Sequence, residues 1–286
     1  MTQPVIRVPE RAWRADRPRH LDSGERLIPE EAAVAFTYDG GSYAVMMATP
    51  HDLQDFAVGF SLTEGIVSAP DDIQQLDIVA QDIGGRGSGI ELRMWLAAPR
   101  SAALAERRRH MAGPTGCGLC GIESLAEALR PVPRLGDRSN TTTFQPNEIM
   151  RALASLAPRQ DLNRQTRAVH AAAYWRRNLG LAALREDVGR HNALDKLCGA
   201  LARQRIAADD GMVLLTSRVS VEMVQKTATL GAPLIVAVSA PTALAVRTAA
   251  AAGITLVAVA RDDGFEIFTH PQRVAASAAA VAESVA

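Results

Sequence analysis

The last third of the chain most constrains the fold, because short apolar runs alternate there with segments of helical length. The apolar runs lie at 211–217, 233–239 and 255–261, and the helical segments lie at 217–231 and 240–253. Strands separated by helices of about 10–15 residues are typical of βαβ crossovers, which build a parallel or mixed sheet. The pattern therefore predicts an α/β domain with a mixed sheet over 141–286, with an edge strand at 265–270.

The first half of the chain predicts a smaller α+β unit. Paired apolar runs indicate two β-hairpins, at 31–49 and at 76–97. The first hairpin contains Asp39-Gly40, a dipeptide typical of tight turns, and the second has a glycine-rich connection. We assign this unit to residues 29–140.

A helix is expected between the two hairpins. Thr49 is a residue type that caps helices, and Pro50 suits the first helical position. Apolar residues, including Phe56 and Phe60, then recur at the spacing of a buried helix face. Gly65 is a plausible end for this helix.

The N-terminal residues and the overall charge exclude several classes of protein. Residues 1–28 are rich in Arg and Pro and contain no apolar run that could act as a secretion signal, so we expect an unstructured tail and a cytoplasmic location. Lys plus Arg and Asp plus Glu both number 31, so the formal net charge is zero. That balance does not favour nucleic acid or a membrane surface as a partner. The apolar stretch 232–260 is interrupted by polar residues, proline and glycine, which argues against a membrane span.

A pair of cysteines surrounded by glycines is the most distinctive chemical feature. Cys117 and Cys120 lie within GPTGCGLCGIESLAEALR, residues 113–130, followed by helical periodicity from Ile122. Glycines leave the backbone unrestricted, and the positive end of a following helix lowers the pKa of a nearby thiol. The pattern favours a reactive thiolate that carries sulfur as a persulfide.

Other interpretations of the pair stay open at this point. A structural zinc site needs four ligands and the chain offers one pair, so no metal site is predicted. A redox dithiol, normally placed between a strand and a helix, and a loop without chemistry are further alternatives. Cys198, in contrast, lies among leucines at helical spacing and is predicted to be a core residue.

Two strand-to-helix turns are candidates for an anion site. Ser217 and Ser239 each follow a predicted strand and can cap the next helix, while Arg218 can donate two hydrogen bonds to a phosphate. Ligands of open α/β sheets bind at the carboxyl ends of strands, where helix N-termini favour anions. The alternative is that both are ordinary capped helices.

The segment EDVGRHNALDK, at 186–196, concentrates charged residues around His191 and Asp195. These two residues lie four apart and so share a helix face, which makes them candidates for a site. The alternative is a solvated, salt-paired start of a helix. His170 is flanked by small apolar residues, which is more typical of a buried structural histidine.

Taken together and in order, several segments resemble the FdhD family, the formate dehydrogenase accessory sulfurtransferases. The segments are TPHDLQDFAVGFSLTEGIV at 49–67, CGLCG at 117–121, REDVGRHNALDK at 185–196, SRVSVEMVQK at 217–226, SAPTALAV at 239–246 and THPQR at 269–273. The resemblance runs from about residue 29 to residue 273.

The resemblance implies a sulfur carrier that is also a sulfurtransferase enzyme. Such a protein accepts sulfur from a cysteine desulfurase as a persulfide on Cys117, with Cys120 as a second acceptor or helper. It then passes the sulfur to the molybdenum (or tungsten) bis-guanine-dinucleotide cofactor before insertion into the formate dehydrogenase apoenzyme. A rival interpretation is a chaperone that only binds and docks this cofactor, with cysteines that are structural or sense redox state.

The resemblance also implies where the dinucleotide binds and what the fold is. The implied cofactor-binding residues beyond the two turns and the charged segment are Val259, Ala260, Arg261, Asp262, Asp263 and Gly264. The C-terminal domain should be similar to the cytidine deaminase-like α/β fold, and members of the family tend to form homodimers. Where the family usually has two glycines before the histidine, this chain has Arg167 and Ala168.

Overall fold

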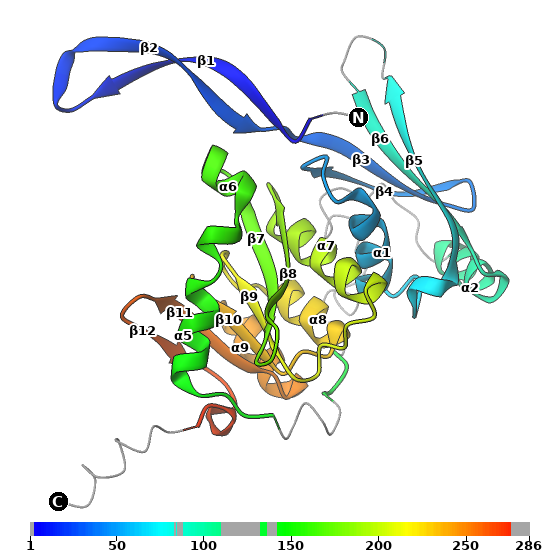
Figure 1. Cartoon of the computed structure of the whole chain (residues 1–286). Helices are drawn as coiled ribbons and strands as arrows, with labels where there is room; N and C mark the ends of the chain where they lie inside the picture. The colour runs from blue at the N-terminus through cyan, green and yellow to red at the C-terminus, as the bar shows by residue number, and fades with distance from the viewer. Residues whose placement is uncertain (1–2, 83, 85–87, 110–131, 136–141, 276–286) are drawn as a thin grey trace, which may run out of the picture.

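The structure, a computed structural model, describes residues 3–82, 84, 88–109, 132–135 and 142–275. It is a mixed α/β protein built on two larger sheets and a separate two-stranded hairpin (Figure 1). The strands are β1 (Val5–Arg14), β2 (Arg17–Pro29), β3 (Ala32–Tyr38), β4 (Gly41–Ala48), β5 (Ile73–Asp82), β6 (Ser88–Leu96), β7 (His170–Arg176), β8 (Gly180–Asp187), β9 (Met212–Leu215), β10 (Leu234–Ala237), β11 (Thr255–Arg261) and β12 (Gly264–Ile267). The helices are α1 (Leu53–Thr63), α2 (Ala98–Arg109), α5 (Pro146–Ala154), α6 (Asp161–Thr166), α7 (Arg190–Arg203), α8 (Val221–Leu230) and α9 (Ala243–Ala252), with single 3₁₀ turns η1 (Pro70–Asp72), η2 (Ala157–Arg159) and η3 (Pro271–Arg273).

The C-terminal sheet confirms the alternation of strands and helices read from the sequence. Its order is β12-β11-β10-β9-β7-β8, in which β9, β10 and β11 are parallel and β12 is an antiparallel edge strand. Side chains of α7, α8 and α9 form one core with one face of the sheet, and α5 packs on the opposite face (Figure 1). The central strands β9 and β10 are buried along their whole length, as expected for a sheet covered on both faces.

Strands β7 and β8 extend this sheet beyond what the sequence pattern indicated. They form an antiparallel pair, and β7 also pairs antiparallel with β9. The small residues of HAAAYWR give no apolar–polar alternation, because the centre of β7 is covered on both faces. One consequence is that His170 opens β7 and Asp187 closes β8, opposite one another in register.

The N-terminal sheet has the order β4-β3-β6-β5, and both predicted hairpins are confirmed. The turn between β3 and β4 has positive φ at Asp39 (50°) and Gly40 (77°), the geometry that favours Asp-Gly in tight hairpins. One face of the sheet packs on α1 through a core that includes Phe36, Phe56 and Phe60. The ring centroids of Phe36 and Phe60 lie 4.1 Å apart.

Residues 5–29 form a long antiparallel hairpin, where the composition indicated an unstructured tail over 1–28. The hairpin projects from the body near α6 (Figure 1), and the Arg26 guanidinium donates to the Thr166 carbonyl oxygen at 3.3 Å. Trp13 and Leu21 face each other in register and are 60 % and 61 % exposed. The Arg- and Pro-rich composition concealed the strands because their stability comes from pairing along the ladder rather than from a buried face.

Helix α1 joins the two units by packing directly against α7, and two glycines make the contact possible. A Cβ on Gly59 would lie 1.7 Å from the backbone oxygen of Asp195, and one on Gly199 would lie 1.9 Å from the backbone oxygen of Asp55. The two backbones therefore approach more closely than any side chain would allow. The contact therefore holds the N-terminal unit, which contains α1, against the C-terminal domain, which contains α7.

Replacing Gly59 by Ala should strongly destabilise the protein. The added methyl group cannot fit, so α1 and α7 must separate, and we expect the free energy of unfolding to fall by about 3 kcal/mol. Urea denaturation followed by circular dichroism measures the change. Gly24→Ala is the control, because its Cβ would meet ordinary contacts at 3.7 Å; equal stability of the two variants would contradict the packing argument.

The start of α1 differs from the sequence prediction. Thr49 was expected to cap a helix that begins at Pro50, but α1 begins at Leu53, and Asp52 is the residue before it. The Thr49 hydroxyl instead accepts the Val188 backbone N–H at 3.1 Å, from the other unit. A partner distant in sequence thus outweighs the local capping preference.

Arg167 has a backbone conformation that favours glycine. It ends α6 with φ 56° and ψ 31°, and its side chain is exposed. A left-handed conformation costs a residue with a Cβ roughly 1–2 kcal/mol, and glycine pays no such cost. The resemblance noted from the sequence implies a glycine at this position, and the left-handed backbone is one that glycine adopts without strain.

Replacing Arg167 by Gly should therefore stabilise the protein. After the greater freedom of glycine in the unfolded chain is deducted, we expect a gain of about 0.5–1 kcal/mol in the free energy of unfolding. Arg164→Gly, inside α6, should have the opposite sign because the backbone there is helical. Chemical denaturation of both variants decides the matter, and a loss of stability in Arg167→Gly would refute it.

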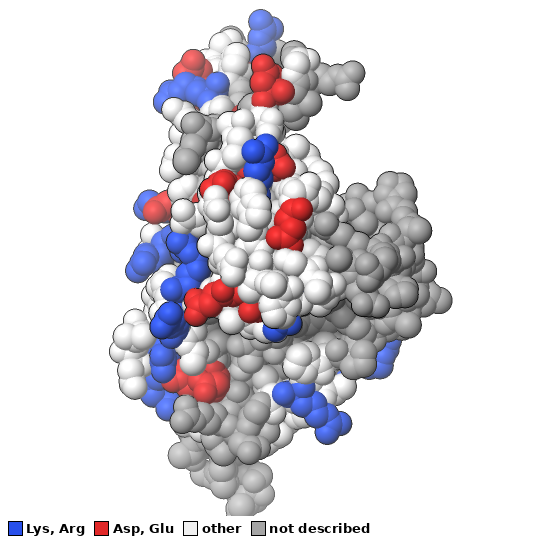
Figure 2. Space-filling view, turned by 90° about the vertical axis from the view of Figure 1, so that its right-hand side faces the viewer, with Lys and Arg blue, Asp and Glu red and all other residues white. Residues whose placement is uncertain are grey.

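Positive and negative residues are interspersed on the face shown in Figure 2, in agreement with the balanced composition. Opposite charges also pair locally, as in Arg100 with Asp72 at 3.0 Å and Arg93 with Glu91 at 2.8 Å. In the part of the chain that the structure describes, every helix is too short or too polar to span a membrane.

Candidate functional site

The carboxyl ends of four strands meet along one edge of the C-terminal sheet. Because β7 is antiparallel to both β8 and β9, strand β8 runs parallel to β9, β10 and β11. The ends of these four strands and the start of β7 therefore share an edge, which we call the carboxyl edge. The helices α7, α8 and α9 begin directly beyond it, so their N-termini gather there (Figure 1).

The loops along the carboxyl edge are tied to one another. Val219 and Pro241 form a parallel bridge, so the loops after β9 and β10 continue side by side. The Val259 backbone N–H donates to the Ser239 carbonyl oxygen at 3.4 Å, which links the end of β11 to the loop after β10. At the other side, the Thr216 hydroxyl accepts the Ala171 N–H at 2.8 Å. Residues far apart in the sequence thus form one continuous rim.

Ser217, Arg218 and Ser239 lie in these loops, but the two serines are not the helix caps that the sequence indicated. The N-cap of α8 is Ser220, and that of α9 is Thr242, whose side chain accepts the Ala245 N–H. Ser217 is buried and its hydroxyl donates to the Arg218 carbonyl oxygen at 3.0 Å. Each loop is three residues longer than expected, because the strand-like bridge between the two loops postpones the helix.

The segment from Val259 to Gly264 begins at the carboxyl edge and forms the tight hairpin between β11 and β12. Arg261 and Gly264 are paired in register, so Asp262 and Asp263 form the turn between β11 and β12 and are exposed. Val259 has φ 52°, which is rare for a β-branched residue and costs backbone energy. Such strain is typical of functional sites, where surrounding contacts maintain it.

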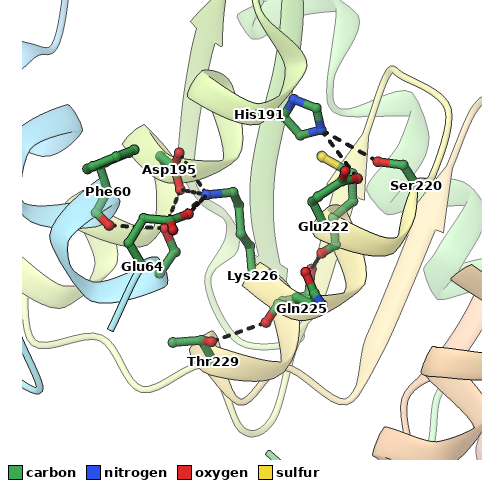
Figure 3. A network of polar contacts seen from close by, with 12 residues as sticks. Phe60, Glu64, His191, Asp195, Ser220, Glu222, Gln225, Lys226 and Thr229 are labelled. Atoms are coloured by element: carbon green, nitrogen blue, oxygen red, sulfur yellow. Dashed lines mark hydrogen bonds and ion pairs between the residues drawn. The ribbon is translucent and has the colours of Figure 1, made fainter. Parts of the chain in front are cut away.

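His191 lies in the first turn of α7 and faces the start of α8. Its Nε2 is 3.5 Å from the Ser220 hydroxyl and 3.7 Å from the Glu222 carboxylate (Figure 3). The neighbouring His191 and Ser220 side chains favour the charged carboxylate and lower the pKa of Glu222 to about 2. His170, at the start of β7, is half-buried, and burial together with the charges of Arg190 and His191 lowers the pKa of its imidazole.

Arg190 supplies an unusual feature at this edge. Among the buried side-chain nitrogen and oxygen atoms that the structure describes, only its Nε has no hydrogen-bond partner. A buried donor without an acceptor costs about 1–3 kcal/mol, so an anionic ligand that accepts this bond would bind favourably. The donor lies beside His170 and His191, in the first turn of α7. The residues at the carboxyl edge therefore fit a phosphate-bearing ligand.

Asp195 faces away from the carboxyl edge, into the contact between α7, α8 and α1. It is 1 % exposed, and its carboxylate accepts Lys226 Nζ at 2.8 and 3.0 Å and the Thr63 hydroxyl at 2.6 Å (Figure 3). Glu64 lies 3.4 Å from the same ammonium group. Burial acts to lower the pKa of Lys226, but the two carboxylates raise it above its ordinary value. His191 and Asp195 thus share a helix face, as predicted. His191 lies at the carboxyl edge, whereas Asp195 lies in the buried contact of α7 with α8 and α1.

The predicted reactive pair, Cys117 and Cys120, lies outside the described residues. Cys198 is a core residue, as predicted: it is 2 % exposed among the apolar side chains of the C-terminal core, and burial raises the pKa of its thiol. Among the residues that the structure describes, no three or more His, Cys, Asp or Glu side chains are grouped so as to hold a metal ion.

Several residues at or behind the carboxyl edge were not identified from the sequence. Arg190, Glu222 and the buried pair Asp187 and Lys196 stand out only in the folded chain. The dense segment at 186–196 contains three of them, and its charge density was the available signal. Recognising Asp187 as buried requires knowing that β8 exists, and one of its partners, the Thr49 N–H, is 138 residues away in the sequence.

Comparison with known proteins identifies the group to which this chain belongs. The model of the FdhD/NarQ family matches residues 29–275. The chain belongs to the FdhD/NarQ family. It is 55 % identical over 252 residues to a protein of Agrobacterium fabrum named sulfur carrier protein FdhD, covering 88 % of this chain and 90 % of that protein. A protein of the same name from Brucella abortus is 54 % identical over 260 residues, covering 91 % and 94 %.

A solved structure shows the same fold. The crystal structure of a putative formate dehydrogenase accessory protein from Desulfotalea psychrophila superposes with a TM-score of 0.69, at 22 % identity, and covers 95 % of this chain and 99 % of that one. The mixed α/β architecture is therefore found in an experimental structure of a distant relative.

The contact between His191 and Glu222 predicts an acid-dependent loss of stability. The folded-state pKa of Glu222 is about 2, against an ordinary value of 4.5 for a glutamate side chain. The contact therefore stabilises the fold fully above about pH 4.5, and the contribution is lost as the pH falls toward 2. We expect the difference in unfolding free energy between the wild type and Glu222→Gln to shrink by about 1–2 kcal/mol between pH 6 and pH 3.

Urea denaturation across that pH range measures the difference. Glu266→Gln, which removes an exposed carboxylate on β12, is the control and should follow the wild type throughout. A constant gap between the wild type and Glu222→Gln at every pH would show that the His191 contact does not depress this pKa.

Proposed function

We propose that this chain is a sulfur carrier that serves a formate dehydrogenase. It accepts sulfur from a cysteine desulfurase on Cys117 and passes it to the molybdenum (or tungsten) bis-guanine-dinucleotide cofactor before insertion into the apoenzyme. The names of its relatives, which match across most of the chain, support the sulfur-carrier role. The glycine-bracketed CGLCG at 117–121 supplies thiols with the chemistry that such a role needs.

The groups gathered at the carboxyl edge are the observation that supports binding of the cofactor. Three helix N-termini gather there, and the Arg190 Nε is a buried donor without a partner. Both features favour the phosphates of a dinucleotide. The strained Val259, linked to Ser239, closes the same rim. The exposed turn at Asp262 and Asp263 carries negative charge, so backbone N–H groups nearby are the better candidates for contact with phosphate.

The sulfur steps balance without a metal of the protein's own. The Cys117 thiolate attacks the outer sulfur of the desulfurase persulfide, the donor S–S bond breaks, and the desulfurase cysteine leaves as a thiolate. Attack by Cys120 on the Cys117 sulfur then releases the outer atom as sulfide for the cofactor, which is the substrate. A Cys117–Cys120 disulfide forms and supplies two electrons, and a cellular dithiol reductant restores both thiols. The protein supplies positioning, and the cofactor supplies the reactive centre.

Transfer of labelled sulfur tests the carrier role. We expect Cys117→Ala, incubated with a cysteine desulfurase and ³⁵S-cysteine, to lose about nine-tenths or more of the protein-bound label, because the attacking thiolate is gone. Cys198→Ala is the matched control and should keep the label, since that thiol is buried in the core. Full retention of label in Cys117→Ala would exclude it as the carrier.

The same variants separate the carrier from a pure cofactor chaperone. If both Cys→Ala variants at 117 and 120 still produce active formate dehydrogenase, the chain docks the cofactor without carrying sulfur. Loss of dehydrogenase activity with retained binding of guanine nucleotide supports the carrier.

A further inference from the structure

Behind the carboxyl edge lies a buried cluster centred on Asp187, the last residue of β8. Asp187 is fully buried, and its carboxylate accepts four hydrogen bonds. Oδ1 accepts the Gly189 N–H at 2.7 Å and Asn192 Nδ2 at 3.0 Å. Oδ2 accepts the Thr49 N–H at 3.0 Å and Lys196 Nζ at 2.6 Å. A carboxylate with this many donors is fixed in position.

Thr49 lies between β4 and α1, in the N-terminal unit. All three of its polar groups form hydrogen bonds with this cluster or with the residue next to it. Its N–H donates to Asp187, its carbonyl oxygen accepts Lys196 Nζ at 2.9 Å, and its hydroxyl accepts the Val188 N–H at 3.1 Å. Two residues earlier, the Met47 carbonyl oxygen accepts Asn192 Nδ2 at 2.8 Å. Hydrogen bonds from the N-terminal unit thus hold the loop between β8 and α7 from one side.

The loop is also closely packed at Gly189, where the cluster leaves no room for a side chain. A Cβ on Gly189 would lie 2.7 Å from Asn192 Nδ2 and 3.4 Å from Asp187 Oδ1. The two residues that follow it, Arg190 and His191, are those that present an unpartnered Nε and an imidazole at the carboxyl edge. Asp187 and Lys196 are both completely buried, so they cannot touch a ligand themselves.

We propose that Thr49, Asp187 and Lys196 are positioning residues, which hold the loop after β8 so that Arg190 and His191 meet the dinucleotide. This inference rests on the proposed function, because it assigns the carboxyl edge to that ligand. The N-terminal unit then contributes to cofactor binding without contacting the cofactor. Binding sites lose affinity when the groups that support their contact residues are removed, since the contacts are no longer pre-organised.

The test uses Thr49, because Asp187→Ala would leave the buried Lys196 ammonium without its carboxylate and is expected to unfold the protein. Thr49→Val removes one hydroxyl and keeps the shape of the side chain. Thr227→Val is the matched control: Thr227 is also fully buried, and its hydroxyl donates to the Met223 carbonyl oxygen within α8. Thr49→Ser restores the hydroxyl and serves as the rescue.

Guanosine diphosphate is the probe, with its Kd measured by calorimetry at a temperature where circular dichroism shows every variant folded. We expect Thr49→Val to weaken binding roughly tenfold, the scale set by loss of one supporting hydrogen bond, while Thr49→Ser and Thr227→Val stay within about twofold of the wild type. Amide exchange at 188–192 should rise in Thr49→Val alone. Loading of ³⁵S from the desulfurase should not change, because that step uses the cysteine pair.

Each other outcome has a definite meaning. If Thr49→Val binds guanosine diphosphate as the wild type does, or if Thr227→Val weakens binding equally, the positioning role is wrong and the proposed function stands. If the wild-type chain itself fails to bind the nucleotide, assignment of the carboxyl edge to the dinucleotide is wrong, and the positioning role falls with it.

Discussion

The close contact between α1 and α7 fixes how the N-terminal unit sits against the C-terminal domain. Gly59 and Gly199 bring the two helix backbones together, and no larger residue fits at either position. Buried charged clusters tie the middle of α7 to the residues that flank α1, Thr49 before the helix and Thr63 at its end. Lys196 bonds Asp187 and the Thr49 carbonyl oxygen at one end of α1, and Lys226 bonds Asp195 beside Thr63 at the other. Polar groups buried in this way require partners in fixed places, so they define one register between the helices.

This register has a direct effect on the carboxyl edge. Helix α7 carries its first turn to the edge and its middle into the contact with α1, so any movement between the units would displace Arg190 and His191. The pairs His191–Glu222 and Asp195–Lys226 bind α7 to α8 at equivalent four-residue spacings (Figure 3). The start of α8 is therefore placed by the same contact.

The proposed activity divides between two parts of the chain with opposite physical needs. A dinucleotide site requires donors that are already in position, which the packed carboxyl edge offers. A sulfur carrier requires an accessible thiolate, which the sequence predicts for the glycine-bracketed pair Cys117 and Cys120. Cys198 shows the contrast, since burial in the apolar core raises the pKa of its thiol and leaves it a packing residue.

Features that depend on local periodicity and local chemistry could be predicted from the amino-acid sequence. The hairpin at Asp39-Gly40, the alternating strands and helices from β9 to β12 and the core position of Cys198 are readable from residues close together in the chain. The family is readable from an ordered set of such segments. The hydrogen-bond partners of Thr49 and Asp195 could not be predicted in this way, because folding brings them together. Thr49 caps no helix because Val188 and Lys196 satisfy its polar groups, and Asp195 turns inward to Lys226. Their partners lie between about 30 and 150 residues away, and a buried polar group bonds whatever the fold brings to it, which no local pattern records.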